Sequence, residues 1–474
     1  MRPIHAYADD ALADHDATGL VEMLHRGQVS SAELVEAALA RTERVDADLG
    51  AVAYLDADRA RREARSPNPG YFSGVPTFIK DNCDVEGQPT QQGTDAYVAK
   101  PARRDGDLAR LVHATGAITL GKTRLSEFGF NGAVDHPRLG PVRTPWHPGH
   151  YAGASSAGSA ALVAAGAVPF AHANDGGGSI RIPASVNGLV GLKTTRDRIP
   201  QDAMFGEMPV RICSDGVLTR SVRDTAAFLR EAERIYRNPK LPRIGDVSGP
   251  SRRRLRIGFT SDGIGRSATG EVRDLTTETA AMLESLGHRV EEIAPPVPDG
   301  FVEDFLIYWS MLALVLRRTG KVRFGRTFDA SKLDNLTHGL AHFCARRLHR
   351  LPKAVASLAR SGRHTAPLWR SYDLVLTPTL ATSTPALGHL DPMADYDQVM
   401  GRLLDWVAFT PLANATGEPS LSLPLATTAS GLPQGMMFGA PKGRERVLLE
   451  LAYELEEARP WARIQDATIA AYDG

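Results

Sequence analysis

Cysteine is scarce in this chain, with only Cys83, Cys213 and Cys344 among 474 residues. An odd number of widely separated cysteines does not form a disulfide framework and is typical of reduced thiols in the cytosol. The segment from Met1 to His5 also lacks the apolar core of a secretory signal. We therefore expect a cytoplasmic protein with free thiols.

Metal-binding and common hydrolase motifs are missing as well. The 14 histidines are scattered, and neither an H-E-x-x-H nor a C-x-x-C pair occurs, so no ligand spacing supports a metal. There is no G-x-S-x-G nucleophile elbow. We expect chemistry that needs neither a metal nor a cofactor.

An excess of charge and a long apolar run are the remaining absences. Lysine plus arginine and aspartate plus glutamate number 55 each, so no overall field favours nucleic acid or an anionic membrane. The longest apolar candidate, residues 305–316, ends at Arg317 and Arg318 and is too short to span a bilayer. It is expected to be a buried helix, with a membrane-touching cap as the alternative.

A glycine-rich segment is the most informative feature that is present. Asn174-Asp175-Gly176-Gly177-Gly178-Ser179 precedes Ile180-Arg181-Ile182-Pro183, near which a helix is expected to open. Glycines let backbone N–H groups converge on one point. A hydroxyl beside such a nest supplies a nucleophile and donors for the oxyanion that forms when a carbonyl is attacked. Alone, the segment is equally consistent with a flexible turn.

Two further segments support the catalytic interpretation. Gly153-Ala154-Ser155-Ser156-Ala157-Gly158-Ser159 places Ser155 24 residues before Ser179. Gly74-Val75-Pro76-Thr77-Phe78-Ile79-Lys80-Asp81-Asn82 is an apolar, strand-like stretch that ends in a lysine. In this order and spacing, the three segments resemble the amidase signature family, and the resemblance covers most of residues 20–460.

The resemblance implies a Ser–Ser–Lys triad. Ser179 would be the acylated nucleophile, Ser155 the bridging serine, and Lys80 the base. The backbone N–H groups of Gly176, Gly177, Gly178 and Ser179 would form the oxyanion hole. It also implies a cis peptide bond between Ala154 and Ser155. Within the family, the segment around Ser179 is most similar to the branch of 6-aminohexanoate cyclic dimer hydrolase and the aryl acylamidases.

The chemistry places a demand on Lys80. A lysine is a base only when neutral, yet its reference pKa is about 10.4. Burial lowers the pKa of a lysine, and the apolar neighbours Val75, Phe78 and Ile79 favour this. Asp81 and Asp84 would oppose it if they pointed inward. Because a hydroxyl both donates and accepts, Ser155 can relay the proton without a histidine.

Four departures from the common family pattern concern residues near the triad. They are Ala154 with Ala157, Asn174 with Gly176, Arg124, and Val186 with Asn187. Because none touches a triad position, we expect them to affect the choice of substrate rather than catalysis.

Two competing interpretations are rejected. Residues 116–123 match the phosphate-binding pattern G-x-x-x-x-G-K-[ST], but residues 107–114 have helical spacing, so Gly116 is expected to cap that helix. Residues 117–120 then form a buried strand rather than a phosphate loop. His172 is expected in a buried strand, hydrogen-bonded to backbone, rather than as a catalytic base.

The length alone favours two or three domains, but the resemblance implies one α/β domain over residues 1–474, with a central mixed sheet flanked by helices. The catalytic core is expected at about 71–230, and a variable helical region on the substrate side at about 303–362. A capping box at Ser30–Glu33 starts a helix, residues 238–254 form a surface connection, and residues 255–293 form a βαβ unit.

The expected function is a serine amidohydrolase (EC 3.5.1 type) that acts on aryl amides or on linear or cyclic oligomeric amides. A glutaminase subunit of an amidotransferase, feeding ammonia to a partner, is the alternative, and a catalytically silent binding protein is a third class that the intact triad disfavours. The expected partner is a small-molecule amide, without nucleic acid or stable membrane insertion, and a homodimer is the assembly to test.

Overall fold

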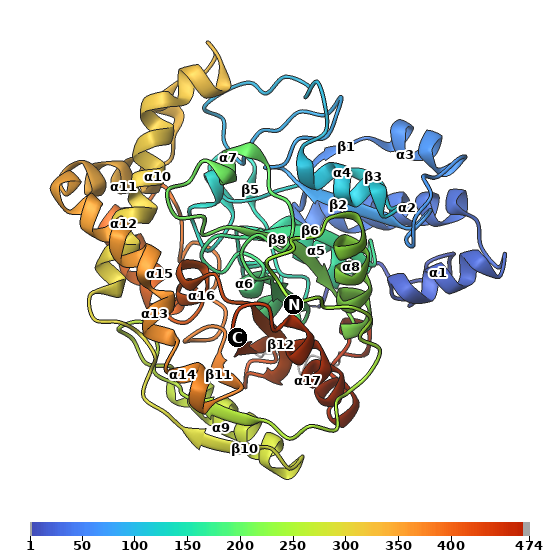
Figure 1. Cartoon of the computed structure of the whole chain (residues 1–474). Coiled ribbons are helices and arrows are strands. Elements are labelled where there is room, and N and C mark those ends of the chain that lie inside the picture. Colours follow the sequence, from blue (N-terminus) through green and yellow to red (C-terminus); the bar gives the residue numbers. More distant parts are fainter. Residues whose placement is uncertain (1, 468–474) are drawn as a thin grey trace.

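An eight-stranded mixed sheet runs through the middle of the molecule (Figure 1) in the computed structural model, which describes residues 2–467. Its strand order is β10-β9-β11-β13-β12-β7-β8-β6. The pairs β10/β9 and β9/β11 are parallel, and every other pair is antiparallel. The strands are β6 (Phe170–Asp175), β7 (Val190–Lys193), β8 (Ser214–Thr219), β9 (Arg256–Phe259), β10 (Arg289–Glu292), β11 (Leu374–Pro378), β12 (Ser420–Thr427) and β13 (Pro433–Gly439). This confirms the predicted α/β fold with a mixed central sheet.

A smaller three-stranded sheet carries Lys80. It has the order β1-β3-β2, with β1 (Val52–Leu55), β2 (Pro76–Lys80) and β3 (Ile118–Thr123). Strand β2 packs beside β6 of the large sheet, where Thr77 Oγ1 donates to the Phe170 carbonyl at 3.0 Å. The last residue of β2 therefore lies next to the strand that leads to Ser179. A short pair, β4 (Asp135–His136) and β5 (Gly140–Pro141), lies apart from both sheets.

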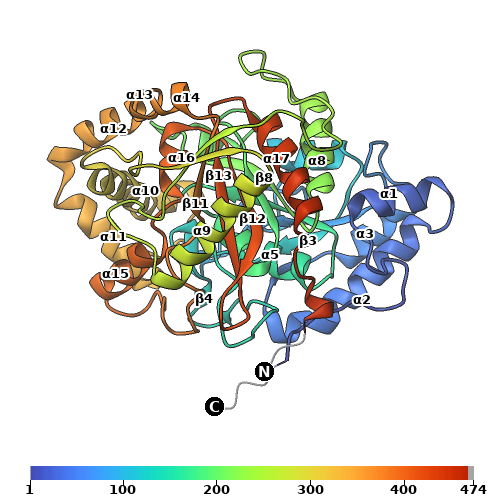
Figure 2. The same cartoon turned by 90° about the horizontal axis from the view of Figure 1, so that it is seen from below.

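Helices surround the sheets, and Figure 2 shows α8, α9 and α17 in front of the large sheet. Helix α2 begins with the predicted capping box, in which Glu33 N–H donates to Ser30 Oγ at 3.2 Å and Ser30 N–H to Glu33 Oε2 at 2.8 Å. The longer helices are α1 (Ala17–His25), α2 (Ser31–Leu49), α3 (Ala57–Ala64), α4 (Asp107–Ala114), α5 (Ala157–Ala164), α6 (Arg181–Asn187), α8 (Val222–Ile235), α9 (Gly270–Ser285), α10 (Phe301–Phe324), α11 (Asn335–Ala345), α12 (Leu351–Arg360), α15 (Tyr396–Trp406) and α17 (Glu445–Ala458). The shorter ones are α7 (Ala203–Gly206), α13 (Gly362–Thr365), α14 (Leu368–Ser371), α16 (Pro411–Thr416) and four 3-10 turns.

Two fully buried helices fix the serine segments. Every residue of α5 and α6 is buried, and α5 consists of alanine, glycine and serine apart from Leu162 and Val163. Small side chains let α5 approach β6, β2 and α6 closely. The loops that precede α5 and α6 carry Ser155 and Ser179, so both serines are attached to fully buried helices.

The segment that matches a phosphate loop is a strand. Residues 118–123 form β3, all of them buried, between β1 and β2. Helix α4 ends with Thr115 as its C-cap, and Gly116 follows at φ +91°. The N–H groups that a phosphate would need are engaged in a sheet, as predicted.

The predicted helical region 303–362 is made of α10, α11 and α12, with breaks between them. Residues 305–316 lie inside α10, where Phe305, Tyr308 and Met311 are buried, which favours the buried helix over the membrane-touching cap. Among the described residues, no helix is both long enough and apolar enough to cross a membrane. The predicted βαβ unit is also present, as β9, α9 and β10.

Candidate active site

Lys80, Ser155 and Ser179 are brought together from three separate segments. Ser155 and Ser179 line one cavity of about 230 Å³. Lys80 is fully buried behind Ser155, and its Nζ donates to Ser155 Oγ at 2.7 Å. The peptide bond between Ala154 and Ser155 is cis, as the family resemblance implies.

Asn174 also contacts the Lys80 amine. Its Oδ1 accepts from Lys80 Nζ at 2.7 Å, and Ser156 Oγ accepts at 2.9 Å. Asn174 and Asn82 exchange amide hydrogen bonds of 3.1 and 3.2 Å, which fix the Asn174 side chain. The expectation that none of the four departures touches the triad is therefore wrong for Asn174. The contact between Asn174 and Lys80 was missed because the distance between β6 and the end of β2 is set by tertiary packing alone.

The other departures lie where they shape loops or the cavity. Arg124 donates to the carbonyls of Gly50 and Gly140 at 2.8 and 2.6 Å, and Asn187 donates to the Ala152 carbonyl at 2.7 Å, close to the Ser155 loop. Gly176 faces Trp309: a Cβ built at Gly176 would lie 3.5 Å from the indole. Ala154 and Ala157 are buried.

Burial lowers the pKa of the Lys80 amine toward neutral pH. Desolvation lowers its pKa to about 7, and the opposing influence of Cys83, Cys213, Asp215 and Asp175 is smaller. Asp81 and Asp84, which we considered from the sequence, are not among these groups: Asp81 lies 3.3 Å from Lys122 Nζ. Near neutral pH a substantial fraction of Lys80 is therefore a neutral amine.

Burial alone does not single out Lys80. Desolvation also lowers the pKa of Lys193 to about 7, but Lys193 Nζ donates to the Thr194 carbonyl at 2.9 Å. Lys122 is buried too, beside Asp81. Of the three, within residues 2–467, only Lys80 has a hydrogen bond to a serine that lines the cavity.

His172 positions the backbone at Lys80. Its Nδ1 accepts from the Lys80 N–H at 3.2 Å, so Nε2 carries the proton and donates to Asp215 Oδ1 at 3.1 Å. The predicted bond to backbone is confirmed, whereas Asp215, which lies in β8, was missed because no motif marks it.

His172, Asp215 and Cys83 form the one cluster of metal-ligand types among the described residues, with their donor atoms within 4.8 Å of one another. The imidazole has no lone pair left for a metal, because Nδ1 accepts a hydrogen bond and Nε2 donates one. Burial also raises the pKa of the Cys83 thiol, which disfavours the thiolate that a metal would need. We interpret the cluster as a support for β2.

Asp175 organises the backbone around Ser179. Its carboxylate accepts from the N–H groups of Gly178 at 2.8 Å and Ile180 at 3.1 Å, and it pairs with Arg181 at 2.9 Å. Gly178 has φ +138°, and a Cβ there would lie 2.4 Å from Thr410 Oγ1, so only glycine fits.

The bond to Asp175 changes the predicted oxyanion hole. The Gly178 N–H already donates to a carboxylate, so it is not available for an oxyanion. Among the described residues, the N–H groups of Gly176, Gly177 and Ser179 have no hydrogen-bond partner. These three remain as the donors that can meet a developing negative charge.

The cavity in front of the two serines is mainly apolar. Trp309 stacks on Phe305 with ring centroids 5.9 Å apart and meets Phe130 edge-on at 5.7 Å. The other apolar lining residues come from the loop at 128–130, from α7 with the residues after it, and from α10; they are Phe128, Met204, Phe205, Met208, Pro209, Met311, Leu312, Val315 and Leu316. Helix α10 is the only part of the predicted helical region 303–362 that lines this cavity.

The family model described as Amidase matches residues 33–449. The chain therefore belongs to the amidase family and is an enzyme that hydrolyses amide bonds. The protein AmiC of Mycobacterium leprae (strain TN), which carries the name of an amidase, is 58% identical over 466 residues, or 98% of this chain and 99% of the relative.

Two solved structures share the fold. One is 6-aminohexanoate cyclic dimer hydrolase, with a TM-score of 0.86 and 29% identity, covering 97% of this chain and 99% of that one. The other is a bacterial aryl acylamidase, with a TM-score of 0.84 and 25% identity, covering 95% of this chain and 98% of that one. Both belong to the branch that the segment around Ser179 resembles.

Proposed function

We propose that this amidase cleaves its substrate through an acyl-enzyme on Ser179, with Ser155 relaying the proton to Lys80. The observation that carries this proposal is the 2.7 Å hydrogen bond between the buried Lys80 amine and Ser155, which lines the same cavity as Ser179. A serine hydroxyl becomes an effective nucleophile only when a base takes its proton.

Counting hydrogens on the neutral amine supports Ser155 as the relay. A neutral amine has two N–H bonds and one lone pair. Asn174 Oδ1 can only accept, and Ser156 Oγ donates its own proton to the Asn174 carbonyl at 3.3 Å, so Ser156 also accepts from Lys80. Both N–H bonds are then used. In the neutral form the 2.7 Å hydrogen bond therefore reverses, and the Ser155 hydroxyl donates to the lone pair of Lys80 Nζ.

The acylation half of the reaction then follows. Ser179 Oγ attacks the amide carbon while its proton passes to Ser155 and the Ser155 proton passes to Lys80. The oxyanion accepts from the N–H groups of Gly176, Gly177 and Ser179, which are already in place. When the C–N bond breaks, the leaving nitrogen takes the proton back through the same relay.

The deacylation half repeats these steps with water. Water attacks the ester carbon of the acyl-enzyme, loses its proton through the relay, and Ser179 leaves with a proton restored. The balance is one amide and one water giving one carboxylic acid and one amine. This scheme routes no step through a metal or a cofactor.

The apolar cavity indicates the acyl group. Aromatic and aliphatic walls around Trp309 and Phe130 suit an aryl or an alkyl acyl chain. The names of the two structural relatives, a 6-aminohexanoate cyclic dimer hydrolase and an aryl acylamidase, agree with this class. A glutaminase would need free charged partners for the ammonium and carboxylate of glutamine on the acyl side. Glu207 and Arg323 also line this mainly apolar cavity, but they pair with each other at 3.1 Å, so we favour the amidohydrolase over the amidotransferase subunit.

A fluorophosphonate probe tests the assignment of the nucleophile. We expect it to modify Ser179, because phosphonylation needs an activated oxygen beside an oxyanion hole. Ser179→Ala should lose both labelling and hydrolysis, whereas Ser155→Ala should retain slow labelling with turnover reduced by roughly two or more orders of magnitude. A mass spectrum that places the adduct on Ser155 or Ser156 would overturn the mechanism.

A further inference from the structure

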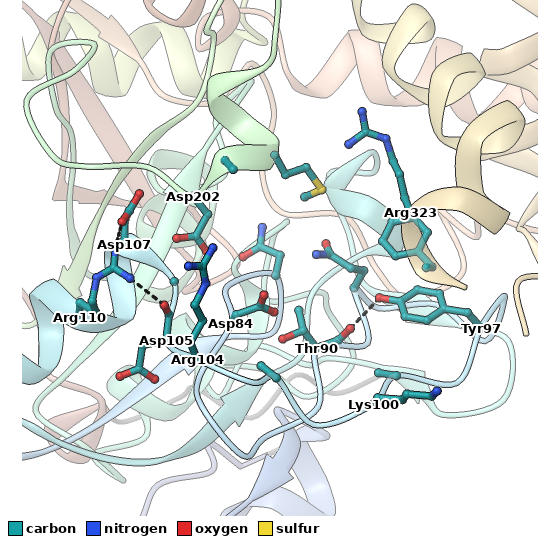
Figure 3. A pocket seen from close by; sticks show the side chains of 18 of the residues that line it. Asp84, Thr90, Tyr97, Lys100, Arg104, Asp105, Asp107, Arg110, Asp202 and Arg323 are labelled. Atoms are coloured by element: carbon teal, nitrogen blue, oxygen red, sulfur yellow. Dashed lines mark hydrogen bonds and ion pairs between the residues drawn. The ribbon is translucent and has the colours of Figure 1, made fainter. Parts of the chain in front are cut away.

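A second, polar cavity adjoins the catalytic one (Figure 3). It has a volume of about 480 Å³ and is walled mainly by residues 97–107 and by α7. Asn82, Gln92, Met204 and Arg323 line both cavities. Of the two cavities, the apolar one is lined by Ser179, and the charged one adjoins it through this shared wall.

Most charged groups in the polar cavity already have partners. Asp107 pairs with Arg110, Asp105 Oδ2 lies 3.0 Å from His113 Nδ1, and Arg323 pairs with Glu207 at 3.1 Å. These pairs hold the walls of the cavity together and leave little charge for a ligand.

Asp202 is partly engaged, since its Oδ1 accepts from the Leu108 N–H at 3.3 Å near the start of α4. The guanidinium that remains is Arg104. Within residues 2–467, Arg104, Lys100 and Asp84 are exposed, line the cavity and have no ion-pair partner. Figure 3 shows the Arg104 side chain in the left half of the view, extending up to just below Asp202, whereas Lys100 lies at the lower right.

We propose that the polar cavity is the amine-side subsite and that it takes an amine part bearing a carboxylate, so that the product released is an amino acid. The proposal rests on the proposed function. Arg104 binds the carboxylate, because a guanidinium matches its planar geometry. The ammonium that forms when the leaving amine gains a proton from solvent faces Asp84 and Asp202. The acyl part stays in the apolar cavity on Ser179.

The two ends of the substrate are thereby separated by polarity. An apolar acyl group gains from burial against Trp309 and its neighbours. A carboxylate there would lose its hydration without a free partner, because Arg323 already pairs with Glu207. In the polar cavity the same carboxylate meets an unpaired cation. The substrate class is therefore N-acylated amino acids, including ω-amino acids, rather than amides with a neutral or purely cationic amine part.

A matched pair of anilides tests this assignment. N-hexanoyl-4-aminobenzoate and N-hexanoyl-4-aminobenzamide differ in charge but little in shape, so the ratio of their kcat/KM values reports recognition of the carboxylate. We expect Arg104→Gln to lower this ratio about five-fold, and the wild-type ratio to fall as ionic strength rises. Arg103→Gln is the control, because Arg103 is exposed but does not line the cavity.

An unchanged ratio in Arg104→Gln, or an equal fall in Arg103→Gln, would overturn the proposal. A third anilide with its carboxylate on the acyl side distinguishes the two cavities: if Arg104→Gln lowered its kcat/KM instead, the subsites would be reversed and the proposal wrong. Protection of Ser179 from fluorophosphonate by 4-aminobenzoate, compared with 4-aminobenzamide, gives a readout without turnover, and equal protection would also overturn it. If Ser179 takes no label at all, the proposed function itself fails.

Discussion

At the scale of single residues, the proposed mechanism depends on keeping one amine neutral and pointing its lone pair in one direction. Desolvation achieves the first for Lys80, and Asn174 with Ser156 achieves the second. These are separate properties, since the pKa controls the fraction of active enzyme and orientation controls the rate of that fraction. Two predictions separate them.

We expect the rate to rise with pH through about 7 and then to reach a plateau, because the pKa of Lys80 is lowered to about 7 and only the deprotonated amine accepts a proton. Lys80→Ala should abolish this rise in rate with pH along with most turnover. Lys193→Met should keep the rise in rate with pH, since the Lys193 amine bonds to the Thr194 carbonyl and to no other group within residues 2–467. A pH profile of kcat/KM measures both, and a wild-type rate at neutral pH in Lys80→Ala would exclude Lys80 as the base.

Asn174→Ala should lower the plateau by roughly 10- to 100-fold, because the amine loses the acceptor that orients it. The pH at which the rate rises should stay the same or become lower, since removing an acceptor destabilises the ammonium form of Lys80. Asn174→Thr, which restores the residue common in the family, should recover part of the rate. A rise in rate that shifted to higher pH in Asn174→Ala would contradict this role for Asn174.

At the scale of elements, helix α10 connects the scaffold to the choice of substrate. Phe301, Phe305 and Trp309 lie on one face of α10, with stacked rings whose centroids are 5.7 and 5.9 Å apart. Gly176, three residues before Ser179, lies beside Trp309, since a Cβ there would be 3.5 Å from the indole and 3.0 Å from Cys213 Sγ. A substitution in α10 therefore changes the cavity without touching the triad.

We expect Trp309→Ala to shift the preference toward larger acyl groups by roughly ten-fold or more in kcat/KM, because it enlarges the apolar cavity. A series of 4-nitroanilides with acyl chains of increasing length measures the shift. Val322→Ala is the matched control, since Val322 lies in the same helix and is 90% exposed. The same chain-length optimum in Trp309→Ala and the wild type would show that Trp309 does not limit the acyl group.

At the scale of the whole molecule, the buried Arg181 guanidinium connects the Asp175 carboxylate to a distant part of the chain. Arg181 binds Asp175 with two hydrogen bonds of 2.9 Å, and it also donates to the Thr410 carbonyl at 2.9 Å and to Asn414 Oδ1 at 2.7 Å. Asp175 ends β6, and Asn414 lies in α16. The nucleophile segment is thus held to an element more than 200 residues away in sequence.

Arg181→Ala should lower the free energy of unfolding by about 3–5 kcal/mol, because it leaves the Asp175 carboxylate buried without its counter-charge. Arg138→Ala removes an ion pair of similar geometry with Asp95, but Arg138 is 65% exposed, so its cost should be about 1 kcal/mol or less. Thermal or urea unfolding compares the two variants. Equal losses would mean that the Asp175 pair contributes no more than a surface pair.

The assembly state is a further prediction at this scale. We propose a homodimer as the form to test, and light scattering coupled to size-exclusion chromatography distinguishes it from a monomer. A monomer across the working concentration range would exclude it.

The sequence by itself predicted the elements and the chemically special residues of this protein. The capping box at Ser30, the strand that ends at Lys80 and the glycine segment before Ser179 depend on local backbone preferences, which short stretches of sequence encode directly. The phosphate-loop match was rejected for the same reason, since the spacing around Gly116 is that of a helix followed by a strand.

Only the tertiary structure decided which groups meet the reactive ones. Asn174 reaches Lys80, Asp215 reaches His172, and Asp175 takes the Gly178 N–H that we had assigned to the oxyanion hole. The polar cavity likewise combines residues 97–107 with α7 and the end of α10. These contacts join strands and helices that are far apart in the chain, so they follow from how the two sheets and α10 pack, and packing distances are not encoded in any local pattern.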